Sequence, residues 1–591
     1  MAHDVKSRLT ALLQQALDSV APSATDTPIQ LERPRDPTHG DFATNLAMQL
    51  AKALKKNPRE IAQQLVNELP VSALVTKAEV AGAGFINFTL DAGAKTSAVK
   101  QVLIEGENYG RSTQGGWQKV QVEFVSANPT GPLHVGHGRG AAYGASLSSL
   151  LTFAGWDVTR EYYVNDAGRQ MDILGLSTWL RYLEQHGVSV QFPPNGYQGD
   201  YVRGMAEQLT HAHGDKFVRS AEAVVAGTPG QPEAGRADDE AKKQRETQLD
   251  ALIANAKELL GPDWDYVHQH ALNEQLAGCR DDLKEFGVEF EVWYSEKALY
   301  DTGLVARCVD LLEQKGHLYV QNGARWFRST TFGDEKDRVV QRENGLYTYF
   351  ASDIAYHLNK FERGFDKVIN IWGADHHGYI PRVTGAIKAL DLDSDKLQVA
   401  LVQFAVLYRN GQKASMSTRS GEFVTLRELR NEVGNDACRF FYALRKSDQH
   451  LDFDLDLAKS QTNENPVYYI QYAHARVCSV INQWLDTHAG DPATLADANL
   501  ALLVNPRELA IANKLVEFKD VIANAARDLA PHLIAFYLKD LAGEFHGWYN
   551  AERMLVDDAA LRDARVALAT AVRQVIRNGL AILGVSCPES M

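Results

Sequence analysis

The stretch from Val122 to Leu151 constrains the fold more than any other part of the chain. It begins as an apolar strand, passes through a turn rich in proline and glycine, and continues as a helix. The run Gly138–Gly144 is made mostly of small residues, which predicts that this helix approaches another element closely. The first backbone N–H groups of a helix have no partner within it, so the junction is suited to binding an anion. His134 and His137 stand at this junction and could add hydrogen bonds to a phosphate.

The two histidines alone have other interpretations. Paired histidines at this spacing also occur as structural residues and as metal ligands. Asp375 and His376 could join His134 and His137 in a metal-dependent hydrolase, although no further partner stands at a recognisable ligand spacing. The histidine pair therefore leaves phosphate binding and metal binding open.

Strands alternate with helices from about residue 117 to 460. Apolar runs at 120–124, 158–164 and 367–372 predict strands, and the longer run 397–408 predicts one more. The helical patterns between them imply crossover connections, and hence an α/β fold with a doubly wound, mainly parallel sheet.

Two other domains are expected to flank this sheet. Residues 1–110 read as an α+β domain with a strand at 84–90, and residues 462–591 read as an all-α bundle. The stretch near 185–275 interrupts the α/β pattern, and we interpret it as an insertion with a flexible loop and no chemistry of its own. One apolar stripe of the bundle follows helical spacing: Ile534, Tyr537, Leu538, Leu541, Phe545 and Trp548.

Composition restricts the class of protein. The net charge of −14 argues against unselective binding of polyanions but does not exclude one specific RNA. No uncharged apolar run is long enough to span a bilayer, and no secretory signal is visible at Met1–Lys6. The five cysteines are odd in number and none lies in a Cys-x-x-Cys pair. We therefore expect a cytoplasmic protein with no membrane contact.

The sequence around the histidines resembles a known signature. Ser126–Pro129 (Ser-Ala-Asn-Pro) followed by Gly131–His137 (Gly-Pro-Leu-His-Val-Gly-His) closely resembles the HIGH signature of class I aminoacyl-tRNA synthetases, in the form found in arginyl-tRNA synthetases. The resemblance implies a Rossmann-like catalytic domain over 117–460, a tRNA-contacting domain over 1–110 and an anticodon-binding domain over 462–591.

The resemblance also implies an ATP site. Gly373-Ala374-Asp375-His376 is similar to the Gly-x-Asp-x-His element of class I synthetases, in which the glycine lets the backbone approach a nucleotide and the aspartate accepts from ribose hydroxyl groups. The ATP-binding residues implied in this way are His134, Gly136, His137, Gly373, Asp375, His376 and Met416.

Tyr349 and Asp353 are the residues expected to recognise the amino-acid side chain. If a helix opens at Ser352 or Asp353, the two residues share one face; the alternative is an Asp N-cap followed by a buried tyrosine. In arginyl enzymes a matching Tyr and Asp line the amino-acid pocket, and a carboxylate can accept the paired N–H groups of a guanidinium. Ser126, Asn128 and His137 are implied to hold the rest of the arginine.

Residues 413–421 occupy the place of the KMSKS loop. Met416 and Ser417 match it, whereas Ser415 and Thr418 stand where its two lysines would be. The positive charge for pyrophosphate must then come from elsewhere, and the candidates are Lys413, Arg419 and Arg409. The expected catalytic residues are His134, His137, Lys413, Met416, Ser417 and Arg419.

Contacts with tRNA are implied at both ends of the chain. The segment His39–Asn45 resembles a signature of the N-terminal domain that contacts the tRNA elbow, although Asp41 could simply be a helix N-cap. Tyr468, Tyr472 and Arg476 lie at i, i+4 and i+8 and could stack on RNA or pack against another helix.

The resemblance as a whole implies a monomeric enzyme that takes arginine, ATP with Mg²⁺, and tRNA(Arg), without a structural metal. It would form arginyl-adenylate and then pass the arginyl group to the terminal ribose of the tRNA. Catalysis would rest on positioning and on charge stabilisation at the α-phosphorus. A non-catalytic RNA-binding paralogue, supported by the missing lysines, is the other alternative, and a cysteinyl enzyme would need a thiolate in the pocket.

Overall fold

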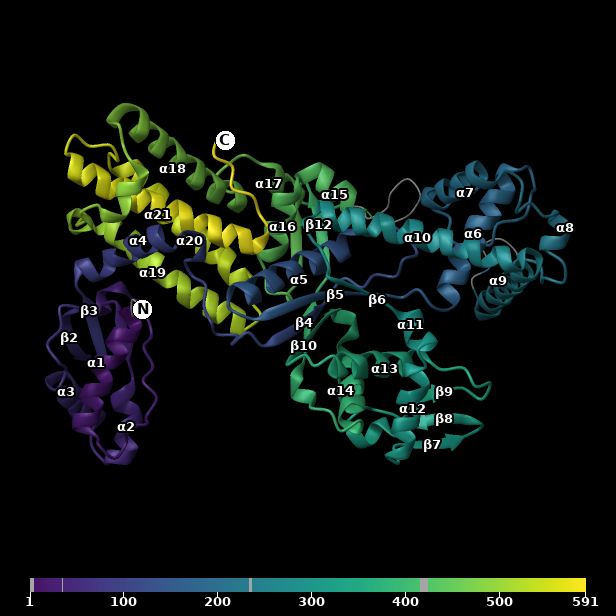
Figure 1. Ribbon diagram of the computed structural model, residues 1–591, viewed down its shortest axis with the longest axis horizontal. Helices are drawn as coiled ribbons and strands as arrows, with labels where there is room; N and C mark the ends of the chain where they lie inside the picture. Colours follow the sequence, from purple (N-terminus) through teal and green to yellow (C-terminus); the bar gives the residue numbers. More distant parts are fainter. Residues whose placement is uncertain (1–4, 35, 233–235, 237, 415–423) are drawn as a thin grey trace.

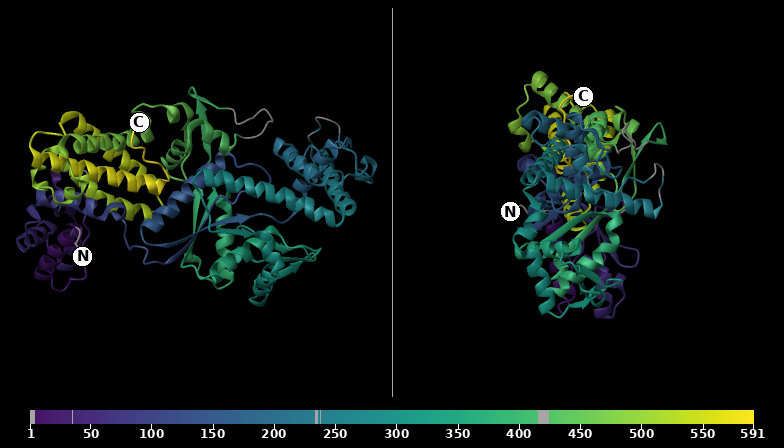
Figure 2. Two further views of the ribbon diagram at one scale, coloured as in Figure 1. Left: turned by 45° about the horizontal axis from the view of Figure 1, so that its top comes forward. Right: turned by 90° about the vertical axis from the view of Figure 1, so that its right-hand side faces the viewer.

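The computed structural model describes residues 5–34, 36–232, 236, 238–414 and 424–591. The molecule is elongated, with the N-terminal part beneath the C-terminal helices at one end and a helical arm at the other (Figures 1 and 2). A parallel sheet lies between these two ends.

The central sheet has five parallel strands in the order β11-β10-β4-β5-β6. They are β4 (Lys119–Glu123), β5 (Asp157–Val164), β6 (Val292–Ser295), β10 (Lys367–Gly373) and β11 (Leu397–Val402). The strand order reverses between β4 and β10, and such a switch point opens a crevice at the carboxyl ends of the strands. The predicted doubly wound parallel sheet is therefore confirmed.

The single strand predicted over 397–408 is wrong. The chain forms β11 and then β12 (Ala405–Arg409), which belongs to another sheet with β13 (Gln412–Lys413) and β14 (Leu451–Asp454). Gln403 breaks the run because its N–H bonds to the carbonyl of Ser447 at 2.8 Å, not to β10. An apolar run looks the same whether it is one strand or two.

The N-terminal part has its own apolar core and a three-stranded antiparallel sheet in the order β1-β3-β2. Its elements are α1 (Val5–Val20), β1 (Phe42–Thr44), α2 (Leu46–Leu54), α3 (Pro58–Asn67), β2 (Val75–Ala81) and β3 (Phe85–Leu90). The helix α4 (Ala92–Glu105) then leads to the central sheet and contacts the C-terminal helices.

Asp41 is not a helix N-cap. The chain forms β1 directly after it, and α2 starts only at Leu46. The buried Asp41 carboxylate instead accepts the N–H of Leu90 at 2.8 Å and pairs with Lys95 at 2.9 Å. It also accepts from Asn513, on the helix α19 (Pro506–Arg527), at 3.4 Å, and so links the N-terminal part to the C-terminal helices.

The stretch predicted as an insertion is mostly helical and has apolar cores of its own. Its helices are α6 (Arg169–Gln185), α7 (Asp200–His213), α8 (Ala221–Val224), α9 (Asp239–Leu260) and α10 (Pro262–Glu285), which together form the arm in Figure 1.

A second α/β unit lies below the sheet in Figure 1, between β6 and β11 in sequence. It comprises α11 (Glu296–Asp301), α12 (Leu304–Gln314), β7 (Leu318–Gln321), β8 (Ala324–Phe327), β9 (Arg338–Gln341), α13 (Tyr349–Glu362) and α14 (Ile380–Ala389).

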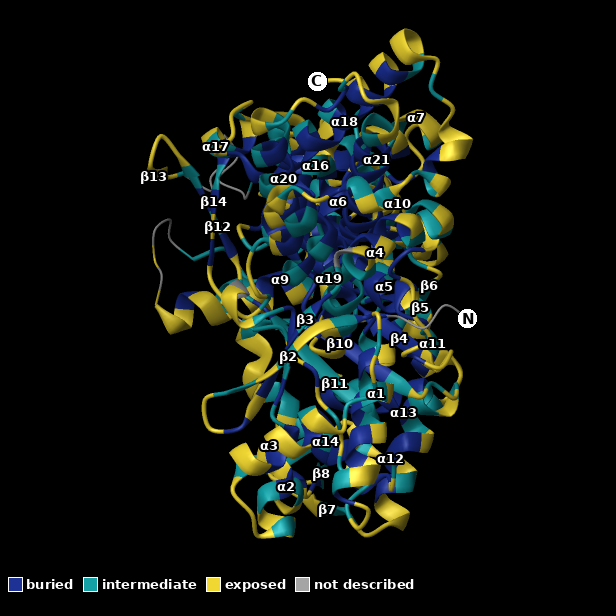
Figure 3. Cartoon of the chain, turned by 90° about the vertical axis from the view of Figure 1, so that its left-hand side faces the viewer, coloured by how far each residue is buried: buried dark blue, intermediate teal, exposed yellow. Residues whose placement is uncertain are grey.

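The C-terminal helices share one continuous apolar core with the sheet and with α5 (Val135–Phe153). They are α15 (Leu426–Val433), α16 (Asn435–Ala443), α17 (Leu455–Lys459), α18 (Pro466–His488), α19 (Pro506–Arg527), α20 (His532–Ala551) and α21 (Ala559–Leu583). All six residues of the predicted stripe on α20 are buried. Figure 3 shows this buried interior surrounded by exposed outer helix faces. By length and composition α21 could cross a membrane, but 72% of its most apolar window is buried inside the bundle.

Candidate active site

The turn after β4 has an unusual backbone. Val125 and Ser126 have φ values of +66° and +42°, a region that side chains other than glycine rarely adopt. The Ser126 hydroxyl donates to Glu123 at 3.0 Å and accepts from the N–H of Tyr163 at 3.1 Å, which holds this turn against β5. Such strain is found where surrounding contacts fix a functional geometry.

His134 and His137 cap the N-terminus of α5. Nδ1 of His134 accepts from the N–H of Gly136 at 3.1 Å, and Nδ1 of His137 accepts from the N–H of His134 at 3.2 Å. Burial lowers the pKa of both rings, that of His137 to about 3 with a further contribution from His134. Since both rings are neutral near pH 7 and both Nδ1 atoms are acceptors, each ring carries its proton on Nε2. The two rings stack with their centroids 3.6 Å apart.

The predicted close approach of α5 is confirmed. A Cβ on Gly144 would lie 2.3 Å from the ring of Phe124, and one on Gly138 would lie 2.8 Å from Leu426. Gly140 has open space where its Cβ would be and lines the cavity described next. The small residues therefore seat the helix against the sheet and leave room beside the histidines.

A cavity of about 450 Å³ lies at the switch point between β4 and β10. Its wall on the β10 side includes Gly373 and part of η4 (Ala374–Tyr379), the 3₁₀ segment that follows β10. The predicted residues that line this one cavity are Ser126, Asn128, His134, Gly136, His137, Gly373, Asp375 and His376. Phe404, which is 52% exposed, completes it from the β11–β12 connection.

The KMSKS-like segment lies mostly outside the described residues, and this includes Met416, Ser417 and Arg419. Residues just after it pair with the HIGH-like segment: the N–H of Val135 bonds to the carbonyl of Val424 at 3.2 Å. Lys413 is exposed on β13, and Arg409 is paired with Glu432 at 2.7 Å.

Tyr349 and Asp353 both lie on α13, which begins earlier than predicted. The helix starts at Tyr349, because the N–H and hydroxyl of Thr348 bond to carbonyls of β9 and fix its entry. Asp353 is therefore inside the helix and not its N-cap. Tyr349 is 56% exposed and lines a second cavity of about 700 Å³. Tyr356, which follows Asp353, is buried, so the alternative interpretation was wrong in its N-cap and correct in its buried tyrosine.

Glu296, which the sequence analysis missed, lines the same second cavity. Its carboxylate is 2% exposed and accepts from the hydroxyl of Ser352 at 3.1 Å. Burial raises its pKa to about 7, with contributions from Asp353 and Asp166, and burial raises the pKa of Asp353 to about 6. Two buried, mutually repelling carboxylates favour a cationic ligand. The sequence around Glu296 shows only an acidic residue in the first turn of a helix. It gives no sign of this pair, because Asp353 is 57 positions away.

Asn165 connects the two cavities. In one orientation its amide donates to Oδ1 of Asn128 at 3.1 Å, and when the amide is turned over it donates to Glu296 at 2.7 Å. Asn128 also lines the first cavity, so one ligand with a polar head and a cationic tail could contact both.

The residues expected to contact tRNA are only partly exposed. The rings of Tyr468 and Tyr472 stack with their centroids 5.9 Å apart. The guanidinium of Arg476 lies 4.3 Å from the ring centroid of Tyr472 and near His546 of α20. They therefore pack along the α18–α20 contact and still reach the surface. Asn45 is half-buried and accepts from Gln49 at 2.7 Å.

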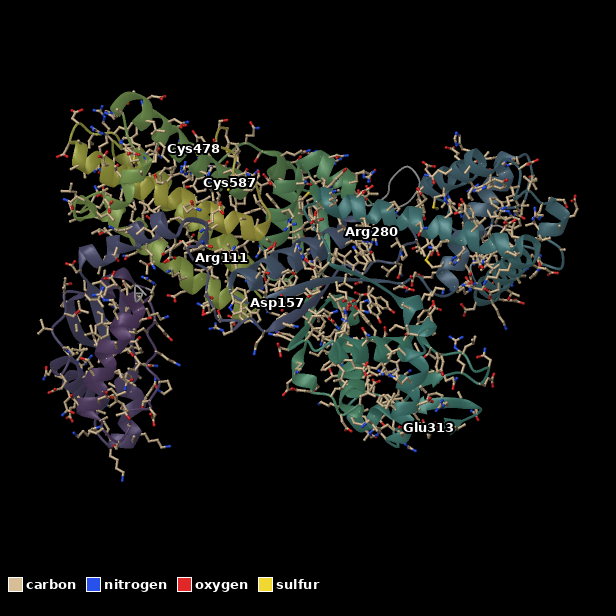
Figure 4. All side chains as sticks on the ribbon, viewed as in Figure 1. Arg111, Asp157, Arg280, Glu313, Cys478 and Cys587 are labelled. Carbon is tan, nitrogen blue, oxygen red and sulfur yellow. The ribbon has the colours of Figure 1, made fainter. Side chains whose placement is uncertain are left out.

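Metal ligands and thiols do not gather at this site. Among the described residues, no group of three or more His, Cys, Asp or Glu is arranged to hold a metal ion, and Asp375 and His376 form an exposed pair at 3.6 Å. All five cysteines are free; Cys478 and Cys587 lie in the C-terminal bundle, far from the switch point (Figure 4).

Three family models match the chain in the same order as the three regions described above. They are the arginyl tRNA synthetase N terminal domain over residues 7–90, the catalytic domain of class I (R) tRNA synthetases over 98–226 and 236–462, and the DALR anticodon binding domain over 470–591. The chain belongs to the arginyl-tRNA synthetase family. The model of the catalytic domain includes the helical arm, and between residues 98 and 462 it leaves only 227–235 unmatched.

Relatives and solved structures of arginyl-tRNA synthetases agree with this family. The chain is 87% identical to the arginine–tRNA ligase of Dechloromonas aromatica over the full length of both, and 52% identical to that of Coxiella burnetii over 99% of each. A putative arginyl-tRNA synthetase from Campylobacter jejuni superposes with a TM-score of 0.73 at 30% identity, covering 85% of this chain and all of that one. The Thermus thermophilus arginyl-tRNA synthetase has the same fold, with a TM-score of 0.71 at 23% identity over 99% of each chain.

Proposed function

We propose that the two connected cavities bind ATP and arginine side by side and that the chain joins arginine to tRNA(Arg). The reaction is that of its family, an ATP-dependent arginine–tRNA ligase of class I. The observation that supports this arrangement most directly is the pair of neutral histidines at a helix N-terminus, facing the β10 turn across one cavity.

In the first step the arginine carboxylate attacks the α-phosphorus of ATP and pyrophosphate leaves. The Nε2–H groups of His134 and His137 donate to the phosphates, where negative charge develops in the transition state, and the positive end of the α5 dipole favours the same charge. Gly373, Asp375 and His376 hold the adenosine. Mg²⁺ bound to the ATP phosphates would neutralise part of their charge, and this needs no cage made only of protein ligands. Lys413, Met416, Ser417 and Arg419 are assigned to the leaving pyrophosphate.

Arginine lies across the link between the cavities. The α-ammonium donates to Asn128 and to the remaining lone pair of the Ser126 hydroxyl, while His137 approaches the carboxylate. The guanidinium is accepted by Glu296 and Asp353, with Tyr349 over the entrance. A lysine ammonium presents a point charge and cannot satisfy both carboxylates with paired N–H groups.

The second step brings the terminal ribose of tRNA to the adenylate. Asn45 in the N-terminal domain and Tyr468, Tyr472 and Arg476 on α18 are the proposed tRNA contacts, the latter as partly exposed aromatic and cationic surface on which bases can stack. We propose that the enzyme works as a cytoplasmic monomer.

Aminoacylation of total bacterial tRNA with each of several amino acids tests this function. Arginine alone should be charged, in an ATP-dependent reaction. Replacing Asp353 with Ala should raise the KM for arginine steeply and leave ATP binding almost unchanged; equal arginine affinity in that variant would refute the assignment of the guanidinium pocket.

A further inference from the structure

Tyr379 connects the two halves of the active site physically. It is the last residue of η4, the segment that also carries Asp375 and His376. Its hydroxyl donates to Oδ2 of Asp353 on α13. A tyrosine from the segment that lines the first cavity therefore holds the carboxylate that is proposed to accept the guanidinium.

The ring of Tyr379 is fixed from several directions. The guanidinium of Arg382 lies over it at 4.7 Å, and Phe350 and Trp372 approach it edge-on at 6.3 and 5.9 Å. Arg382 is itself held 3.4 Å from Asp334, a carboxylate that is 4% exposed. A phenol that is locked in this way fixes the rotamer of its hydrogen-bond partner as well.

The hydrogen bond also acts on the charge of Asp353. Glu123 faces this carboxylate with like charge, as does Glu296, while Lys360 and Arg382 face it with opposite charge. Burial raises its pKa, and the phenol donor lowers it again. The donor thus keeps the carboxylate ionised in surroundings that favour its neutral form.

Trp372 extends the connection to the nucleotide cavity. It lines that cavity, and its ring lies 6.5 Å from that of His376 and 5.9 Å from that of Tyr379. A ligand that fixes the conformation of the β10–η4 turn therefore also fixes the position of Tyr379, which orients Asp353.

We propose that Tyr379 is a positioning residue for arginine recognition, which orients the Asp353 carboxylate and couples it to the nucleotide-binding turn. This inference rests on the proposed function, in which Asp353 accepts the guanidinium. It follows that arginine and nucleotide each change the affinity for the other by the same factor.

The test is equilibrium binding of radiolabelled arginine to the full-length protein between pH 5.5 and 8.5, with and without a non-hydrolysable ATP analogue. In the variant Tyr379→Phe we expect the Kd for arginine to rise about tenfold at pH 7.5, as for the loss of a hydrogen bond to a charged group. The acidic limb of its pH profile should move to higher pH, and the effect of the nucleotide on arginine affinity should disappear.

Tyr356→Phe is the matched control. It removes another buried tyrosine–carboxylate hydrogen bond from α13, the one to Glu161 at 2.5 Å, and should leave arginine affinity and its pH profile unchanged. Unchanged binding in Tyr379→Phe, or equal losses in both variants, would overturn the inference. Asp353→Asn distinguishes failure of the proposed function from failure of this inference. If Asp353→Asn binds arginine normally, Asp353 does not accept the guanidinium and the proposed function is wrong at this residue. If Asp353→Asn loses arginine binding while Tyr379→Phe binds normally, only the role of Tyr379 is refuted.

Discussion

Replacing Glu296 with Gln should make the protein more stable and a poorer binder of arginine. The side chain is 2% exposed, and its pKa rises from the ordinary 4.5 to about 7 in the fold. Because the folded state holds the proton more tightly, this residue costs little stability below pH 4.5, and its cost grows as the pH rises towards and through 7. At about 1.4 kcal/mol per pKa unit the cost reaches about 3 kcal/mol at pH 8 and is about 1 kcal/mol at pH 5.5.

The glutamine keeps the polar contacts and loses only the charge. Its carbonyl can accept from Ser352, and its amide can donate to the oxygen of Asn165 once that side chain turns over. The measurement is the apparent melting temperature at pH 5.5 and pH 8. The stabilisation by the substitution should be about 2 kcal/mol larger at pH 8 than at pH 5.5. For a cooperative unit of a few hundred residues, the increase in melting temperature over wild type should then be roughly 4–8 °C larger at pH 8.

Glu313→Gln is the control, since it neutralises an exposed carboxylate on α12 of the same unit (Figure 4). It should leave the pH dependence of melting unchanged, because exposed ion pairs contribute little. In parallel, the KM of Glu296→Gln for arginine should rise about 10- to 100-fold with little change for ATP, as expected when a charge-assisted hydrogen bond is lost. If Glu296→Gln has the melting temperature of wild type at both pH values, the Glu296 carboxylate does not have a raised pKa in the fold.

Three further predictions address the nucleotide side and the pH response. His137→Ala should lower kcat on the order of 10², as for other preorganised transition-state donors, and near-normal aminoacylation would contradict its role. Arg139→Met should lower the melting temperature and raise the KM for ATP. The buried Arg139 guanidinium donates to three backbone carbonyls, including that of Gln403 in the cavity wall at 2.7 Å. An unchanged KM for ATP would show that the cavity wall does not depend on Arg139. The Kd of wild type for arginine should rise as the pH falls through about 7 and 6, where Glu296 and Asp353 take up protons, and calorimetry in buffers of different ionisation enthalpy should detect proton release on binding at pH 6.

Local patterns in the sequence were enough to predict the elements around the cavity at the switch point. The apolar run of β4, the small residues of α5 and the turn after β10 each carry their information within about twenty positions. Parallel strands place their carboxyl ends at one edge, so His134 and Gly373 could be expected to meet even though more than two hundred residues separate them. The resemblance to arginyl-tRNA synthetases rested on the same short segments.

Only the tertiary structure decided which charges lie together in the proposed arginine site. Glu296 begins one helix and Asp353 lies inside another, and nothing in either local sequence says that burial brings them together and raises both pKa values. The same holds for Asp41, which bonds to β3 and α19 and not to the helix that follows it. Periodicity and capping describe contacts within a few residues, whereas desolvation and charge repulsion depend on neighbours that are distant in sequence and are set only when the chain is folded.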